Sequence, residues 1–316
     1  MTHRRKQRTG PKLRGGARLV LAAHRMGLGL TSRIAPSLAR RWATHLFCKP
    51  PRHKHPKTEQ PYLERGARFN VEGPYGRVAA WRWGQGDRRV LLVHGWGGRG
   101  TQLWPFIEPL CAAGFQVIAF DAPGHGHSPS RYATMLHFAK SMVAVSEAVG
   151  GVYGIVAHSL GAAAANLATS AGWLSVQRVV VMAAPIDVEG MSQAFARALN
   201  ISEPVRAAMQ AHMEARFSHR WQDLEGGRVA AQNRTPALIV HDRDDHDVPF
   251  AAAERLAAHW PQATLLATEK QGHRRILRDP AVVAQVVMFM MGHIQSRRSQ
   301  MSADGCAKAF AALDPA

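Results

Sequence analysis

Short apolar runs alternate with longer amphipathic segments along most of the chain from residue 68 onward. The apolar runs have the length and the valine, isoleucine and leucine content of buried strands, and they cover residues 68–71, 78–83, 90–94, 116–120, 152–157, 179–183, 237–241 and 263–268. Helices are predicted between most of the later runs, and they include residues 135–149, 251–259 and 280–294. This order predicts an α/β fold with a mostly parallel central sheet flanked by helices on both faces.

The alternation of strands and helices is interrupted between about residues 186 and 233, where no strand pattern is found. Within this segment, apolar side chains recur at every fourth position, as on one face of a helix, at Val205, Met209, Met213, Phe217 and Trp221. We therefore expect a helical cap insertion. Its apolar stripe either packs within its own domain or lines an apolar pocket for an acyl chain.

The apolar run before residue 158 leads directly to Ser159, and an alanine-rich segment with high helix propensity follows. The serine stands in the pattern Ala-x-Ser-x-Gly, between Ala157 and Gly161. A strand, a sharp turn with small neighbours and a helix are together typical of a nucleophile elbow, which exposes a serine hydroxyl and holds it rigidly. Ala157 replaces the first glycine of the usual pattern, and an ordinary turn between small residues is the structural alternative.

A glycine-rich loop at residues 94–98 follows the third apolar run. Glycine lets a backbone N–H approach a reacting oxygen closely, as an oxyanion hole requires. We expect the backbone N–H groups of Trp96 and Leu160 to supply the two donors. A loop that only turns the chain is the alternative.

Four aspartates lie between residues 242 and 247, directly after the seventh apolar run and before a Val-Pro pair. The usual pattern at such a position is Gly-x-x-Asp-x-x-Val-Pro, which selects Asp245 as the acid of a catalytic triad. Asp242 and Asp247 are the alternatives in the same loop. Asp187, which comes after the sixth apolar run, is a weaker candidate.

His273 lies in a loop behind the last predicted strand and directly after a glycine. It completes the chain order serine, aspartate, histidine. A histidine at this place could accept the proton of Ser159 while Asp245 orients the imidazole. Most of the other histidines of the chain are expected to have structural or solvated roles.

With these motifs in this order, the chain resembles the α/β-hydrolase superfamily, and in particular its bacterial esterase/lipase-like branch. The resemblance also rests on the Asp-x-Pro-Gly-His-Gly-x-Ser loop at residues 121–128 and on the run Gly-His-Arg-Arg-Ile-Leu-Arg-Asp-Pro at residues 272–280. It covers roughly residues 68–295. It implies the α/β-hydrolase fold and a serine hydrolase with the triad Ser159, Asp245 and His273, without a cofactor or a metal.

The positive charge of the chain is concentrated at its N-terminal end. The formal net charge is +18, and residues 1–60 contain 15 Lys and Arg against one acidic residue. Residues 37–47 have the pattern of an amphipathic helix, and the apolar run at residues 19–23 is too short for the core of a signal peptide. Such an arm either packs on the catalytic body with a solvated basic tail or contacts an anionic membrane surface. Specific binding of nucleic acid is not expected, because no recognised binding module is present.

The cysteines and the hydropathy indicate the compartment. The chain contains three cysteines, Cys48, Cys111 and Cys306, whose spacing suits neither a disulfide framework nor a metal site. This favours the reducing cytoplasm. No apolar run reaches the roughly 18 residues that a membrane span requires, so we expect a cytoplasmic protein or one at the membrane periphery.

These observations predict a basic N-terminal arm at residues 1–60, a hydrolase domain at residues 61–295 and a loose tail at residues 296–316. The predicted activity is hydrolysis of a small-molecule carboxylic ester or thioester through an acyl-enzyme. Acyl transfer and carbon–carbon bond hydrolysis with the same triad are alternatives, as is a non-catalytic binding protein tethered by its basic arm. The sequence does not indicate the oligomeric state.

Overall fold

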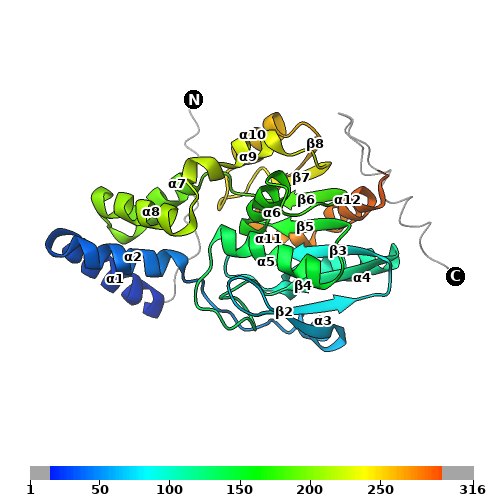
Figure 1. Ribbon diagram of the computed structural model, residues 1–316, viewed down its shortest axis with the longest axis horizontal. Coiled ribbons are helices and arrows are strands. Elements are labelled where there is room, and N and C mark those ends of the chain that lie inside the picture. The colour runs from blue at the N-terminus through cyan, green and yellow to red at the C-terminus, as the bar shows by residue number, and fades with distance from the viewer. Residues whose placement is uncertain (1–14, 294–316) are drawn as a thin grey trace, which may run out of the picture. The chain divides into compact units, whose positions relative to one another are not determined.

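Eight strands form one sheet in the computed structural model, which describes residues 15–293 (Figure 1). Their order across the sheet is β1-β2-β4-β3-β5-β6-β7-β8. The strands are β1 (Ala67–Val71), β2 (Val78–Trp83), β3 (Arg88–Val93), β4 (Phe115–Phe120), β5 (Gly154–His158), β6 (Arg178–Met182), β7 (Ala237–Asp242) and β8 (Ala263–Thr268). Every predicted strand is present within two residues of its predicted ends. The predicted, mostly parallel sheet is confirmed: β2 pairs antiparallel with β1 and β4, and all other pairs are parallel.

Both faces of the sheet are covered by helices. In β3, neighbouring side chains point to opposite faces, and Leu91 and Leu92 are both fully buried. On one face α5 packs against α6, α6 against α9, and α9 against α10. On the other face, α12 packs against α4 and against a 3-10 segment. These elements are α4 (Ile107–Ala112), α5 (Met135–Ala148), α6 (Leu160–Ser170), α9 (Gly226–Gln232), α10 (Ala251–His259) and α12 (Pro280–Met291).

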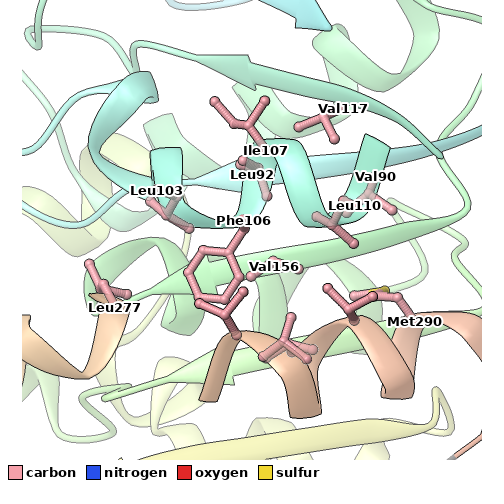
Figure 2. Close-up of a cluster of buried hydrophobic side chains, with 14 of the residues drawn as sticks. Val90, Leu92, Leu103, Phe106, Ile107, Leu110, Val117, Val156, Leu277 and Met290 are labelled. Carbon is pink, nitrogen blue, oxygen red and sulfur yellow. The ribbon is translucent and has the colours of Figure 1, made fainter. Parts of the chain in front are cut away.

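One hydrophobic cluster joins the sheet to α4 and α12. Figure 2 shows side chains from the central strands, from residues 103–110 and from the C-terminal helix meeting in this cluster. Phe106 and Leu110 are fully buried in it, as are Val156 of β5 and Met290 of α12. Burial of each such side chain stabilises the fold by about 1.5–3 kcal/mol. The strand ends described below are therefore carried by a rigid, close-packed body.

The first two helices of the predicted insertion and the two helices nearest the N-terminus belong to a separate compact unit. The chain divides into a unit of residues up to Phe47 with Glu189–Arg220 and a unit of Cys48–Val188 with the chain from Trp221. The first unit contains α1 (Gly15–Ile34), α2 (Pro36–Cys48), α7 (Val188–Leu199) and α8 (Glu203–Phe217). Inside it, a guanidinium nitrogen of Arg25 donates to the carbonyl of Ala198, and the rings of Phe47 and Phe195 lie 5.1 Å apart.

The remaining helical pieces lie in the larger unit. They are α3 (Gln60–Arg65), α11 (Gly272–Arg275) and the 3-10 segments η1 (Gly100–Phe106), η2 (Trp221–Leu224) and η3 (Ile276–Arg278). Cys48 and Cys111 are free thiols. Cys306, the predicted tail at residues 296–316 and the first fourteen residues of the predicted arm lie outside the described part of the chain. No helix between residues 15 and 293 combines the length and the apolar content needed to cross a bilayer.

The parallel strands bring four sequence motifs to one edge of the sheet. The glycine-rich loop follows β3, Ser159 follows β5, the aspartate cluster follows β7, and His273 follows β8. Because parallel strands end at the same edge, the residues that come after them can converge on one site.

Candidate active site

Ser159 occupies a strained turn between β5 and α6. Its backbone has φ of 54° and ψ of −124°, a conformation that costs a non-glycine residue about 1–3 kcal/mol. The turn is held by its own backbone hydrogen bonds, since the N–H of Ser159 donates to the carbonyl of Met182 over 2.8 Å. The Ser159 carbonyl in turn accepts the N–H groups of Ala162 and Ala163.

Two glycines make room for this turn. A Cβ atom at Gly95 would lie 2.7 Å from the Cβ atom of Ser159, and a Cβ atom at Gly161 would overlap the carbonyl oxygen of His94. The close approach of the glycine-rich loop and the serine turn therefore requires glycine at both positions. The serine hydroxyl stands at the centre of this crossing.

A series of hydrogen bonds joins Ser159, His273 and Asp245. The Nε2 atom of His273 lies 3.0 Å from the Ser159 Oγ atom, and its Nδ1 atom lies 2.8 Å from Oδ2 of Asp245. Burial raises the pKa of Asp245, but hydrogen bonds from His273 and from the N–H of Val248 outweigh it and hold the pKa below its ordinary value. An ionised Asp245 fixes the proton of His273 on Nδ1, which leaves Nε2 as the acceptor that faces the serine.

The other aspartates of the cluster have different partners. Asp242 accepts hydrogen bonds from the hydroxyl of Thr268, over 2.7 Å, and from the N–H of Gln271, over 3.0 Å. It thereby ties β7 to the loop that leads to His273. Asp247 lines the cavity described below. Asp187 lies after β6. The two nitrogens of the His273 imidazole already bond Ser159 and Asp245, which leaves neither nitrogen for Asp187.

His158 supports the base from the side of the nucleophile, a role that the sequence did not suggest. Its Nε2–H donates to the backbone carbonyl of His273 over 2.8 Å, and the two rings lie 4.8 Å apart. Burial, followed by repulsion from the His273 ring, lowers the pKa of His158 to about 3. This histidine is therefore neutral and fixes the backbone of the base. Its position directly before the serine is the one feature of the sequence that could have suggested this role.

The glycine-rich loop is held by two further neutral histidines. His94 is fully buried, donates from Nδ1 to the carbonyl of Gly95 and accepts the N–H of Ala122 on Nε2. His125 accepts the N–H of Gly97 over 3.0 Å. Burial lowers the pKa of both rings, that of His125 to about 3.

These contacts fix the loop that carries the N–H group of Trp96 next to Ser159. Leu160 is the first residue of α6, so its N–H has no acceptor within the helix. One of the two predicted oxyanion donors thus belongs to the glycine-rich loop and the other to the serine turn, and the glycines bring these two segments into contact.

The Asp-x-Pro-Gly-His-Gly-x-Ser loop organises the same region. Asp121 is fully buried and accepts the N–H groups of Gly100 and His127, each over 2.7 Å. Ser128 donates to the carbonyl of Asp121 over 2.6 Å and accepts the N–H of Ala79 over 3.0 Å. The motif thus fixes loop geometry around the site.

One group of side chains within residues 15–293 has the spacing to hold a metal ion. The ligand atoms of His55, Asp121 and His127 lie within 4.8 Å of one another. The Nε2 atom of His55 is buried without a hydrogen-bond partner in this part of the chain. The group includes none of Ser159, Asp245 and His273.

A cavity of about 660 Å³ opens beside Ser159 and His273. Its walls come from residues 51–59, from the glycine-rich loop and from residues 273–278. This volume suits a small-molecule ligand.

The chain is similar to known esterases. A family model described as the alpha/beta hydrolase family matches residues 90–286. A pimeloyl-(acyl-carrier protein) methyl ester esterase from Aromatoleum aromaticum is 25% identical over 247 residues, which is 63% of this chain and 96% of that protein. An esterase from Mycobacterium tuberculosis is 33% identical over 135 residues, which is 39% of this chain and 44% of that protein.

Solved structures agree in fold. An esterase from Pyrococcus furiosus matches with a TM-score of 0.59 and 18% identity, covering 78% of this chain and 100% of that chain. The family model spans more than half of the chain, from Val90 within β3 through β8, and includes every residue of the hydrogen-bonded series, so this chain is a member of the alpha/beta hydrolase family.

Proposed function

We propose that this protein is a serine hydrolase that cleaves a carboxylic ester or thioester through an acyl-enzyme. The observation that supports the proposal is the series of hydrogen bonds from Asp245 through His273 to the Ser159 hydroxyl. The strained turn at Ser159 also supports it, because a serine held at a sharp turn between a strand and a helix is typical of a positioned nucleophile. The names of the relatives, which are esterases, agree with ester cleavage.

In the proposed reaction, Ser159 Oγ attacks the carbonyl carbon while His273 Nε2 takes its proton. The N–H groups of Trp96 and Leu160 stabilise the negative oxygen of the tetrahedral intermediate. The imidazolium, which Asp245 stabilises, then gives its proton to the leaving alcohol or thiol. Water repeats the sequence on the acyl-enzyme and releases the acid. Transfer of the acyl group to another nucleophile would use the same steps, and analysis of the products in water and with added alcohols or thiols separates the two outcomes.

The test is covalent labelling with an uncharged fluorophosphonate. We expect the wild type to be labelled on the peptide that contains Ser159. We expect Ser159→Ala to lose both the label and the turnover of p-nitrophenyl acetate, a loss on the order of 10⁶-fold. The control is an unchanged thermal unfolding transition of Ser159→Ala, measured by circular dichroism. Labelling at another residue, or esterase activity that survives Ser159→Ala, would overturn the proposal.

We also propose that the N-terminal region brings this cytoplasmic enzyme to an anionic membrane surface. Helix α1 leaves a stripe of large apolar side chains in solvent, with exposed fractions between 58% and 76%, at Leu19, Met26, Leu30 and Ile34. These positions fall on one side of the helix, and Arg33 is exposed beside them. An apolar stripe within the strongly basic residues 1–60 is typical of a helix that lies in a membrane interface.

Co-sedimentation with vesicles tests the membrane proposal. We expect phosphatidylglycerol vesicles to bind the wild type and high salt to weaken binding, because salt screens the attraction between the basic region and the lipid. The triple variant Leu19→Ser, Met26→Ser and Leu30→Ser should bind less, whereas Val20→Ser, which is 58% exposed at the edge of the stripe, should bind nearly as well as the wild type. Equal binding of the wild type and the triple variant would contradict the proposal.

A further inference from the structure

The walls of the cavity beside Ser159 carry an excess of positive charge. Its lining includes Lys54 and three arginines that follow the base in the chain, Arg274, Arg275 and Arg278. All four side chains belong to residues exposed to solvent, so they stand at the rim of the cavity. The arginines lie on α11 and η3, two short helical turns in which positions three or four apart share a face.

The remaining cation of the lining is already neutralised. Arg99 forms an ion pair with Glu59, which is 1% exposed and also accepts the hydroxyl of Thr101 over 2.8 Å. Burial raises the pKa of Glu59, but hydrogen bonds from His55 and Arg99 outweigh it and lower the pKa. Glu59 therefore stays ionised, and the pair adds no net charge to the cavity.

The rim cations lack such partners. Among residues 15–293, no carboxylate forms an ion pair with Lys54, Arg274 or Arg278. Arg275 donates to the backbone carbonyl of Lys270 over 2.6 Å, which orients the guanidinium and leaves its charge intact. Asp247 is the one carboxylate of the lining other than Glu59.

The wall that carries Lys54 is fixed in place. We call residues 49–56 the strap. The guanidinium of Arg52 ties it down by donating to the carbonyls of Gly124, Ser128 and Ser130, over 3.2, 2.7 and 2.7 Å. The strap also packs on the glycine-rich loop, since a Cβ atom at Gly97 would lie 3.0 Å from Pro51. These contacts hold the backbone of Lys54 at the cavity, which lowers the cost of bringing its ammonium group to a ligand.

From this arrangement we infer that the cavity selects esters that carry a second, anionic group, a carboxylate or a phosphate, and that the rim cations bind this group while the ester carbonyl lies at Ser159. Guanidinium groups bind both anions through paired, charge-assisted hydrogen bonds. The inference rests on the proposed ester hydrolysis, and it names the class of substrate.

Two matched substrate pairs test the inference and distinguish the two anions. The first pair is the mono-p-nitrophenyl ester of glutaric acid against p-nitrophenyl valerate. The second is butyryl-coenzyme A, which carries phosphates, against uncharged butyryl-N-acetylcysteamine. We expect kcat/KM to be about fivefold higher for the charged member of at least one pair, which is the upper end of what an exposed charge pair contributes. We expect this preference to shrink in high salt.

Variants connect the preference to the rim. In the double variant Arg274→Gln and Arg278→Gln, the ratio of kcat/KM between charged and neutral substrates should fall at least threefold. The matched control is Arg82→Gln, an exposed arginine on β2 outside the cavity lining, which should keep the wild-type ratio. Glutarate or inorganic phosphate should also slow fluorophosphonate labelling of Ser159 in the wild type more than in the double variant.

Equal kcat/KM values within both pairs, or a preference that the double variant retains in full, would overturn the inference. Labelling of Ser159 and turnover of neutral esters would then persist, and ester hydrolysis would still stand. Loss of the proposed function has a different signature, because neither pair would be cleaved and Ser159 would not react with the fluorophosphonate.

Discussion

The loops on the two sides of Ser159 are organised by different chemistry. After β7 and β8, the ionised carboxylates of Asp242 and Asp245 accept backbone N–H groups. After β3 and β4, the neutral rings of His94 and His125 accept such groups instead. The difference fits the charge that each side would meet in the proposed reaction. A positive imidazolium forms beside the carboxylates, and a negative oxygen forms beside the loop that the histidines hold.

Asp121 is the exception on the oxyanion side, and its surroundings explain why it is tolerated. Burial raises its pKa, but hydrogen bonds from His127 and from the N–H of Gly100 outweigh it and lower the pKa. Its charge is thus satisfied within the loops themselves. The comparison teaches that a buried carboxylate can stand near such a site when backbone donors already occupy its oxygens.

The largest effect on kcat is expected at Asp245, on the side of Ser159 that carries the carboxylates, and a smaller one at Asp242. Asp245→Asn should lower kcat by about 10⁴-fold, because His273 loses the charged acceptor that fixes its tautomer. Asp242→Asn should cost about 1–3 kcal/mol of stability by weakening a buried loop anchor, with less than about a hundredfold loss in kcat. Kinetics on p-nitrophenyl acetate and urea unfolding measure both quantities. A greater loss of kcat in Asp242→Asn than in Asp245→Asn would reverse the two roles.

On the oxyanion side, substitution of Gly95 should have the next largest effect. Gly95→Ala places a methyl group 2.7 Å from the Cβ atom of Ser159, so the loop and the serine must move apart. A displacement of about 1 Å at a reacting centre costs about a hundredfold in kcat. Gly73→Ala is the matched control, because its Cβ atom would have ordinary contacts of 3.4 Å or more. Equal kcat in the two variants would mean that the crossing is not strained.

The smallest expected effect is a difference between the two sides in how the free energy of unfolding depends on pH. Unfolded histidine titrates near pH 6.5, whereas the folded pKa values of His125 and His158 are about 3. The unfolded chain therefore binds more protons between these values, so the free energy of unfolding falls as the pH is lowered from about 6.5 toward 3. Each such ring contributes a slope of up to about 1.4 kcal/mol per pH unit. The carboxylates, whose pKa values are lowered, keep their contribution above about pH 4 and lose it only below that.

The variant His125→Gln tests this separation. Glutamine can still accept the N–H of Gly97 but does not titrate. Its free energy of unfolding should therefore depend less steeply on pH between 6.5 and 4 than that of the wild type. His246→Gln, at an exposed position of the acid loop, is the control. Urea titrations at four pH values give the slopes, and an unchanged slope in His125→Gln would contradict the assignment of a neutral ring.

The sequence predicted the central part of the sheet well because both faces of the central strands are buried. A strand that is covered on both faces reads as an uninterrupted apolar run, as in residues 90–93, where every side chain is fully buried. The same strands deliver Ser159, Asp245 and His273 to one edge, and the fold brings these three within hydrogen-bond distance. The pairing of Ser159 with His273 follows from the topology more than from any local pattern.

The features that the sequence did not predict depend on contacts between distant segments. Helix α1 continues through Gly27, where a Cβ atom would lie 2.5 Å from the ring of Trp42. Local propensity opposes a helix there, and packing against α2 outweighs it. The roles of His94 and His158 likewise depend on acceptors and donors 28 and 115 residues away in the chain.

The strap lies outside the stretch of the chain that the family model matches. The family resemblance spans residues 90–286 and contains every group proposed to take part in bond cleavage, whereas Lys54 and Pro51 contribute to the cavity from outside that stretch. In the proposed reaction, bond cleavage and the inferred recognition of an anionic group thus depend on different stretches of the chain. A change confined to the exposed side chain of Lys54 would then alter which ester is admitted, while the contacts of Arg52 and Pro51 keep the strap in place and the nucleophile is unaffected.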